Sequence, residues 1–332
     1  MTSKTNKFFK SKTFTLVVMF AVIIAVFSVL SKGSYFSLTN LRTVLNTMVL
    51  YLLLAIGVGL IILLGEIDLS SGYIGTVCGA LLAAMSATFG FPWYVAIFLA
   101  LLLGVVFGLV NGLLINELKF PSFIATLGVG QFIARGLTLV ISSGQTIQIY
   151  DETIIYLGNG RILNKTVPVA IFISLFAVVV YGIILAKTKF GRSIYMCGGN
   201  KDAARLAGLN PKRISYILFA NNGFLGALAG SIFTGRLKAG DLTGTNSYTF
   251  TAITAAILGG ISFGGGTGGM LGCFIGLLVI QSFTNGLVVL RVGTHWMTAA
   301  TGALLIFALI FDYVNNRRST RLKIGKSSRA VQ

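Results

Sequence analysis

The chain has 332 residues, of which 55% are hydrophobic and only 10% carry a charged side chain. Its mean hydropathy is +0.89. Soluble domains usually carry about a quarter charged residues, so these charges cannot cover a water-exposed surface. This composition excludes a soluble enzyme. The formal net charge of +18 does not indicate a nucleic-acid binder either, because the basic residues are spread among short loops. We therefore expect an integral membrane protein.

Helices explain the apolar segments better than the strands of a barrel do. The runs at 14–30 and 93–115 are long and continuous. A helix needs about 20 apolar residues to cross a bilayer, whereas barrel strands alternate apolar and polar residues over about 10 positions. The 41 glycines agree with close helix packing in lipid. The predicted fold is all-α, a polytopic transmembrane helical bundle.

Ten membrane spans are predicted, and no linker divides the chain, so residues 1–332 form a single transmembrane domain. The third and eighth spans are short and rich in Gly or Thr, and either can be a broken or re-entrant helix buried in protein. The predicted spans cover residues 14–30, 43–64, 70–88, 93–115, 122–141, 167–186, 214–234, 248–262, 268–290 and 296–314.

Lysine and arginine set the orientation. With the N-terminus inside, cytoplasmic segments hold 18 of these residues and outer segments hold 7, with Arg135 left inside a span. This asymmetry predicts that the basic ends, 1–13 and 315–332, both lie in the cytoplasm. The first apolar run is interpreted as an uncleaved anchor, since no small-x-small site follows it at 29–34.

The cytoplasmic loop 187–213 contains the clearest local signals for a short surface helix. Asn200 is a good N-cap, Asp202 is favourable in the first turn, and Gly208 is a natural stop. The helix formers between them are Ala203, Ala204, Leu206 and Ala207. From residue chemistry alone, a docking site for another protein and a loop that only fixes topology are equally open.

A family resemblance favours the docking site. The segments 190–192, 198–200 and 203–208 closely resemble the cytoplasmic coupling loop of ribose-type bacterial sugar permeases, which are subunits of ATP-binding-cassette (ABC) importers in the branched-chain amino acid and sugar permease family. Other family elements occur in the same order, and together they span about residues 40–315. These elements are at 65–72, 111–114, 121–128, 258–260, 264–269 and 285–287.

The resemblance implies a permease subunit that imports a sugar or sugar-like solute across the bacterial inner membrane. It implies three partners: a separate ATPase subunit that binds ATP and Mg²⁺, an extracytoplasmic solute-binding protein, and a second permease subunit, identical or different. It also assigns the contact with the ATPase to the coupling loop. The residues so assigned are Gly198, Gly199, Asn200, Ala203, Ala204, Arg205 and Gly208.

This chain carries no phosphate-binding loop of its own. Gly325-Lys326-Ser327 has Thr320 where the first glycine of such a loop belongs, so ATP hydrolysis must come from another polypeptide. No cofactor, metal site or catalytic residue is predicted. A membrane enzyme is disfavoured because the spans lack a His/Asp/Cys constellation.

An ATP-independent secondary transporter of a small polar solute is the alternative. Such carriers usually need an acid deep in the bundle. Here Glu66 and Asp68 are expected at the cytoplasmic end of the second span, either as a solvated end or as a cap for the third helix. Glu66 departs from the resembling family, where glycine is usual. A faint similarity between 64–67 and 258–261 suggests an internal repeat.

Polar residues inside the spans are candidates for the translocation path, although several are expected to bond between helices instead. The four candidates are Asn111, Gln131, Asn222 and Asn285. Arg135 is expected to snorkel or to pair, and His295 to anchor at an outer interface. Cys78 and Cys273 are interpreted as packing residues, without disulfides.

Overall fold

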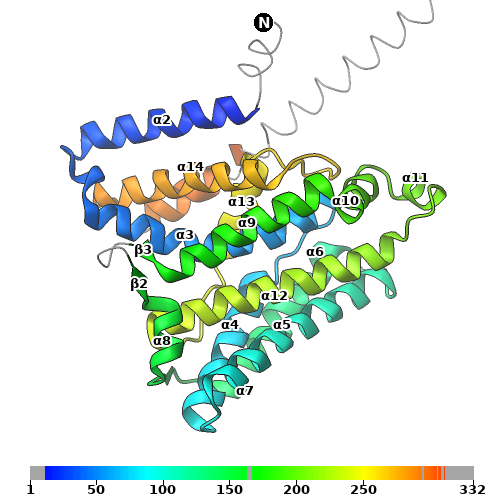
Figure 1. Cartoon of the computed structure of the whole chain (residues 1–332), viewed down its shortest axis with the longest axis horizontal. Helices are drawn as coiled ribbons and strands as arrows, with labels where there is room; N and C mark the ends of the chain where they lie inside the picture. The colour runs from blue at the N-terminus through cyan, green and yellow to red at the C-terminus, as the bar shows by residue number, and fades with distance from the viewer. Residues whose placement is uncertain (1–11, 163–166, 294, 305, 308–309, 311–332) are drawn as a thin grey trace, which may run out of the picture.

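The computed structural model describes residues 12–162, 167–293, 295–304, 306–307 and 310. These residues form a bundle of helices with α2 along one edge and α7 at the opposite one (Figure 1).

The predicted helical bundle is confirmed. Among the described residues, seven helical stretches are long and apolar enough to cross a membrane. They are α3 (Leu38–Leu63), α4 with its π-helical extension η2 (Ser71–Thr88), α5 (Trp93–Asn116), the continuous stretch α6–η3–α7 (Ser122–Ser142), α9 (Val169–Lys187), α12 (Pro211–Leu237) and α14 (Met270–Val289).

Two further apolar helices are shorter. The apolar part of α2 (Lys12–Leu30) is Phe14–Leu30, and α13 (Tyr248–Leu258) has 11 residues. At 1.5 Å per residue α13 is about 16 Å long, roughly half the hydrocarbon thickness. The predicted tenth span, 296–314, extends beyond the described residues.

Short strands join the loops at one end of the bundle. The strands β1 (Ile147–Gln148) and β4 (Ala239–Gly240) pair antiparallel, as do β2 (Arg161–Ile162) and β3 (Val167–Pro168). Between the two pairs lies the helix α8 (Glu152–Asn159), capped by the Asp151 carboxylate. This end is where α12 finishes and α9 begins (Figure 1).

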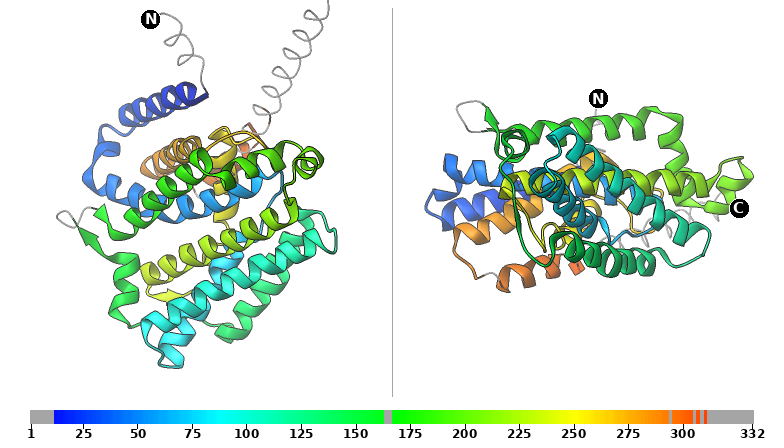
Figure 2. Two further views of the ribbon diagram at one scale, coloured as in Figure 1. Left: turned by 45° about the vertical axis from the view of Figure 1, so that its right-hand side comes forward. Right: turned by 90° about the horizontal axis from the view of Figure 1, so that it is seen from below.

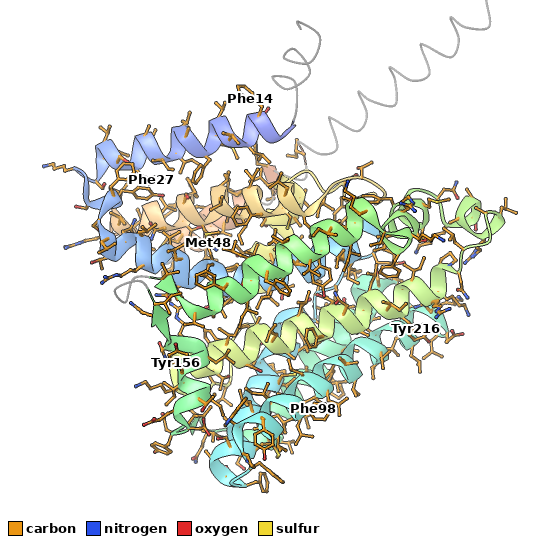
Figure 3. All side chains as sticks on the ribbon, viewed as in Figure 1. Phe14, Phe27, Met48, Phe98, Tyr156 and Tyr216 are labelled. Carbon is orange, nitrogen blue, oxygen red and sulfur yellow. The ribbon has the colours of Figure 1, made fainter. Side chains whose placement is uncertain are left out.

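The helices α3 and α12 form the centre of the bundle. In the most apolar 18-residue part of each helix, 78% of α3 and 67% of α12 is buried, against 28% of α5 and of α9. The helix α2 packs outside α14 (Figure 2). Large apolar side chains cover the outer faces (Figure 3), including Phe176, Val140 and Phe132. Such faces suit lipid or another membrane subunit.

Glycines bring the central helices into backbone contact. A Cβ atom on Gly223 would lie 2.0 Å from the Gly104 carbonyl oxygen, so α12 and α5 touch where neither has a side chain. Gly230 meets Gly75 of α4 in the same way, at 1.9 Å. Close approach through small residues is how helices pack tightly in lipid. Larger residues at these positions would force the helices apart.

Two of the helices are continued by extended segments that enter the bundle. After α3 ends at Leu63, residues 64–70 lead into α4. After α12 ends at Leu237, residues 238–247 lead into α13. The helices α3 and α12 run antiparallel, because Gly57 faces Asn222 while the Asn46 carbonyl oxygen bonds Arg236, closer to the other end of each helix. The two extended segments therefore enter from opposite ends.

Both segments carry the same local motif. Asp68 accepts hydrogen bonds from the backbone nitrogen (2.7 Å) and hydroxyl (2.5 Å) of Ser70. Asp241 accepts the same pair from Thr243, at 3.3 and 2.8 Å. An Asn-Gly-Leu sequence follows each motif at a similar distance along the chain, at 111–113 and 285–287. These residues thus show an internal similarity between two segments that enter the bundle from opposite ends.

Candidate functional site

The loop 187–213, which is expected on the cytoplasmic side, contains two helices, α10 (Lys189–Gly199) and α11 (Lys201–Leu206). The sequence predicted only the second. Glycines are poor helix formers, and α10 contains three of them. It is nevertheless capped by the Thr188 hydroxyl, which accepts a hydrogen bond from the Gly191 nitrogen at 2.9 Å. Its buried face packs on α9 and α3. Tertiary packing therefore outweighs its weak propensity.

The predicted capping of α11 is confirmed. The Asn200 Oδ1 atom accepts hydrogen bonds from the backbone nitrogens of Asp202 and Ala203, both at 2.9 Å. Gly208 follows the helix at φ +80°, a left-handed conformation that favours glycine. Asp202 also pairs with Arg205 at 3.0 Å. These contacts hold the short helix in place before any partner binds.

Exposure separates the residues of α11 into two groups. Leu206 is 92% exposed, and Ala203 and Arg205 beside it are also exposed. Ala204 is only 1% exposed and packs within the chain, so its side chain is not on the surface that was assigned to a partner. Leu206 was treated in the sequence only as a helix former. Its apolar side chain on a polar loop is the feature that sequence reasoning missed.

All three cysteines are free and buried, as expected for packing residues. Cys78 and Cys273 lie in α4 and α14. Cys197 lies in α10, where burial raises the pKa of its thiol and the nearby Lys201 lowers it. The net shift is upward, so the thiol stays protonated at neutral pH and reacts slowly with alkylating reagents.

A polar cluster lies at the beginning of α4, deep in the bundle. Asp68, Ser70, Ser71, Asn111 and Asn222 are all fully buried. The amide nitrogen of Asn222 donates to Asp68 Oδ2 at 2.7 Å and to the Ser71 hydroxyl at 2.8 Å. Asn111 donates to the Ser70 hydroxyl at 2.8 Å. The positive end of α4 and these donors together stabilise a carboxylate in this position.

The same region holds the beginning of α13. The Gly72 nitrogen donates to the Thr249 hydroxyl at 2.9 Å, and the Thr245 hydroxyl donates to the Gly72 carbonyl oxygen at 2.7 Å. Thr76 donates to Asn246 Oδ1 at 2.7 Å. The N-termini of α4 and α13, which we call the two inserted helices, therefore meet. Helix ends at this depth are tolerated only where protein surrounds them, which is the case here.

The expectation that Asp68 is a solvated helix end is wrong, and it lies instead at the beginning of the third predicted span, α4, where the alternative placed it. Its side chain is fully buried, and its main partner, Asn222, lies on α12. The sequence could not reveal this partner because the two residues are 154 positions apart. Among the described residues, no group of three or more His, Cys, Asp or Glu side chains could hold a metal ion.

Comparison with known proteins identifies the family. Residues 40–309 match the family described as the permease component of branched-chain amino acid transport systems. The chain belongs to this permease family. It is 37% identical to the ribose import permease protein of Bacillus subtilis, over 88% of this chain and 89% of that one. No solved structure matches the chain.

Two other relatives carry different solutes in their names. The xylose transport system permease protein of Haemophilus influenzae is 32% identical, over 92% of this chain and 97% of its own length. The autoinducer 2 import system permease protein of Photorhabdus luminescens is 34% identical, over 87% of each chain. The chain is therefore a transport component of the bacterial inner membrane that crosses it several times. It is not an enzyme.

The four path candidates of the permease do not form one site. Asn111 and Asn222 belong to the buried cluster. Asn285 lies on α14 and is 8% exposed. Gln131 instead lies on the exposed side of η3 (Val129–Ala134). Arg135, which follows η3 directly, is exposed as well.

A hollow of ≈910 Å³ lies beside α8, at the end of the permease opposite the loop 187–213. Tyr150 (82% exposed) and Tyr156 line it together with Glu152 and Lys238. Tyr156 marks this end in Figure 3, and Tyr216 lies near the other. The asparagine that follows in α8, Asn159, ties the helix to α12 through the Gly235 and Arg236 carbonyl oxygens, each at 2.9 Å.

Proposed function

We propose that this permease imports a simple sugar of the ribose and xylose class as one subunit of an ATP-driven complex. An external binding protein delivers the solute, and a separate ATPase subunit binds ATP and Mg²⁺. The exposed coupling helix α11 carries the proposal, because a mostly exposed leucine on a capped, rigid loop suits docking into another protein. The relatives named for ribose and xylose support the solute class.

We assign ATPase docking to the exposed part of the coupling loop. Leu206 provides the apolar contact, and Arg205 provides a charge beside it. Gly199 and Gly208 have no atom within 4 Å of an added Cβ, so the surface beside them is open to a partner. Gly198, Asn200 and the buried Ala204 act by shaping the loop, while the exposed Ala203 lies on the docking surface. Nucleotide chemistry belongs to the partner.

The proposed topology has ten spans with both termini in the cytoplasm. Charge asymmetry between the loops supports it. The coupling loop and the α8 region lie at opposite ends of the bundle, as one cytoplasmic and one outer surface would. In this topology α13 is the eighth segment and reaches only about half-way across.

A second permease subunit is proposed to cover the η3 face. Gln131 lies near the middle of the 21-residue stretch Ser122–Ser142 and is exposed, with Arg135 one turn further. A charged side chain at the centre of a span costs about 2.5–3.5 kcal/mol when it faces lipid. Contact with a partner subunit or with a water-filled path between the subunits removes that cost. Gln131 is the path candidate that this arrangement favours.

The proposal is tested by uptake of labelled ribose and xylose into cells that carry the permease with its ATPase and binding protein. Uptake should stop when the catalytic glutamate of the ATPase is replaced, and it should persist while ATP remains after an ionophore collapses the proton gradient. The buried Asp68 makes an ion-coupled carrier the relevant alternative. Uptake that collapses with the ionophore but survives the inactive ATPase would establish that alternative.

A further inference from the structure

Three segments meet directly under the coupling loop, and we call this meeting point the glycine junction. It consists of the end of α10 (198–199), the end of α3 with the following turn (63–65), and the loop between α13 and α14 (264–268). The Gly266 nitrogen donates to the Leu63 carbonyl oxygen at 2.9 Å. The Tyr195 hydroxyl of α10 donates to the Gly268 carbonyl oxygen at 2.8 Å. Hydrogen bonds thus join all three segments.

At Gly198, Gly265, Gly266 and Gly268 the junction has no room for a side chain. A Cβ atom on Gly198 would lie 1.8 Å from the Leu63 carbonyl oxygen and 2.7 Å from the Gly266 nitrogen. One on Gly265 would lie 2.6 Å from the Gly198 carbonyl oxygen. The three backbones are therefore in direct contact. Close-packed backbone of this kind transmits a displacement instead of absorbing it.

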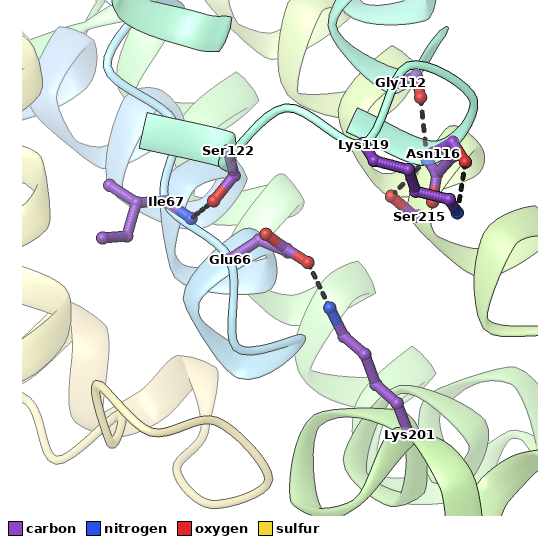
Figure 4. Close-up of polar contacts among 8 residues, drawn as sticks. All are labelled: Glu66, Ile67, Gly112, Asn116, Lys119, Ser122, Lys201 and Ser215. Atoms are coloured by element: carbon purple, nitrogen blue, oxygen red, sulfur yellow. Dashed lines mark hydrogen bonds and ion pairs between the residues drawn. The ribbon is translucent and has the colours of Figure 1, made fainter. Parts of the chain in front are cut away.

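An ion pair adds a second connection beside the junction. Lys201, the first residue of α11, pairs with Glu66, which lies in the extended segment 64–70 (Figure 4). The Glu66 side chain is 12% exposed and that of Lys201 is 45% exposed. The pair connects α11, the helix that carries Leu206, to the segment that leads to Asp68.

Two chain segments connect the junction to the inserted helices α4 and α13. Residues 64–70 carry Asp68 into the buried cluster and continue as α4. The loop that contains Gly266 comes from the C-terminus of α13. The two helices meet at their N-termini through the Gly72–Thr249 hydrogen bond. Segment 64–70 is also held by α6, since the Ile67 nitrogen donates to the Ser122 hydroxyl at 3.2 Å (Figure 4).

We propose that the glycine junction and the Glu66–Lys201 ion pair carry movement of the coupling loop to α4 and α13 as one rigid unit. Glu66 is then a positioning residue of transport: it touches neither solute nor nucleotide and acts through the segment that holds Asp68. The inference rests on the proposed function, because the movement originates in the ATPase. A continuous set of contacts allows transmission but does not prove it, so coupling must be measured.

The kind of contact that each variant disturbs sets the expected loss of coupling. Partly exposed ion pairs change an equilibrium by up to about fivefold, so Glu66→Gln should reduce coupling by roughly two- to fivefold. Overpacking a filled site is more severe, and Gly198→Ala should reduce coupling about tenfold or more. Exchanging the charges, Glu66→Lys with Lys201→Glu, should restore most of the coupling lost in Glu66→Gln.

Two matched controls lie at the same end of the molecule. Lys212 pairs with Glu117 at 2.9 Å and holds the pKa of that carboxyl below its usual range, but this pair joins α12 to the end of α5 and bypasses the junction. Glu117→Gln should therefore leave coupling unchanged. Gly264→Ala should do so too, because the nearest atom to its added Cβ is 3.8 Å away.

The experiment uses the whole complex in proteoliposomes, with ribose as the transported probe. ATP hydrolysis is measured with and without ribose-loaded binding protein, and the ratio of the two rates is the coupling. Membrane content and co-purification of the ATPase show that each variant is assembled. A flexible bis-maleimide cross-link between cysteines placed at Glu66 and Lys201 provides a further arm, because the long side chains of this pair leave the two backbones too far apart for a disulfide. It should leave coupling intact, because the two sites move together.

Loss of coupling in Glu66→Gln, restoration by the charge exchange and an active cross-linked form would support the inference. Wild-type coupling in both Glu66→Gln and Gly198→Ala would overturn it, and so would inactivation by the flexible cross-link. Because Gly198→Ala can fail to fold, the charge exchange decides in that case. If the unaltered complex showed no ATP-dependent uptake of ribose or xylose, the proposed function itself would fail.

Discussion

A single small substitution at Gly57 can disturb the buried cluster, because this glycine contacts Asn222. A Cβ atom on Gly57 would lie 2.1 Å from the Asn222 Oδ1 atom and 3.1 Å from its Cγ. Favourable contacts of this kind need about 3.5 Å, so Gly57→Ala must push the amide by roughly 1 Å. The 2.7 Å hydrogen bond from Asn222 to Asp68 then stretches beyond the range of such bonds.

The cost follows from the groups involved. A hydrogen bond to a charged group contributes about 1.5–3 kcal/mol to stability. Alanine also favours a helix over glycine by about 1 kcal/mol, which offsets part of the loss. We expect Gly57→Ala to lower the free energy of unfolding by about 0.5–2 kcal/mol. In Gly182→Ala in α9, nothing lies within 4 Å of the new Cβ. This variant should show only the stabilisation of about 1 kcal/mol that alanine gives a helix.

Thermal unfolding of the purified permease in detergent checks this difference. The two variants should differ by about 1.5–3 kcal/mol, the lost hydrogen bond itself. At roughly 2–4 °C per kcal/mol, Gly57→Ala should melt about 3–12 °C below Gly182→Ala. In an Asn222→Ala background, Gly57→Ala should no longer destabilise, since both act on one bond. If Gly57→Ala melts at or above Gly182→Ala, the bond to Asp68 does not stabilise the fold as argued.

Three further predictions concern topology, docking and selectivity. In a background without native cysteines, an impermeant thiol reagent added outside intact cells should label a cysteine at Asn159 but not at Ser3 or Ser328; labelling at Ser328 would contradict the ten-span topology. Leu206→Asp should leave the permease in the membrane but reduce co-purification of the ATPase about tenfold or more, since it places a charge in an apolar contact; unchanged co-purification would rule out docking through this residue. Asn285→Ala should change the rate of sugar uptake more than the preference between ribose and xylose, measured by competition; a switch in preference would place selectivity in this subunit.

Local signals in the sequence were sufficient for the helices and their caps. Long apolar runs predicted α3, α5 and α9 to within a few residues at most ends, because hydrophobic length is a property of one segment. The Asn200 cap was predicted for the same reason. The helix α10 was missed because its stability comes from packing on α3 and α9, which its own glycines do not reveal.

The candidate site depended on contacts that no local pattern contains. Asp68 was expected at an interface because a charge inside a membrane is costly, and that reasoning omitted the donors which offset part of the cost. Those donors are Ser70, directly before α4, and Asn222 on α12. The matching motif at Asp241 was visible in the sequence. Its significance comes from the structure, in which both aspartates accept hydrogen bonds from the backbone nitrogen and the hydroxyl of the residue two positions on.

The buried cluster also bears on where solute selectivity arises. Asn111 and Asn222 are fully buried, and their amide nitrogens already bond to Ser70, Ser71 and Asp68. A sugar could reach these amide nitrogens only by breaking those bonds and leaving their partners unsatisfied, at about 1–3 kcal/mol each. The Oδ1 atoms of Asn111 and Asn222 have no hydrogen-bond partner, but they are buried as well. The amides therefore serve to hold α4 in place, and few polar groups in the spans are left to recognise a solute. If a binding protein delivers the sugar, as proposed, a permease built in this way gains selectivity most readily from that protein, while its own proposed task is to move α4 and α13.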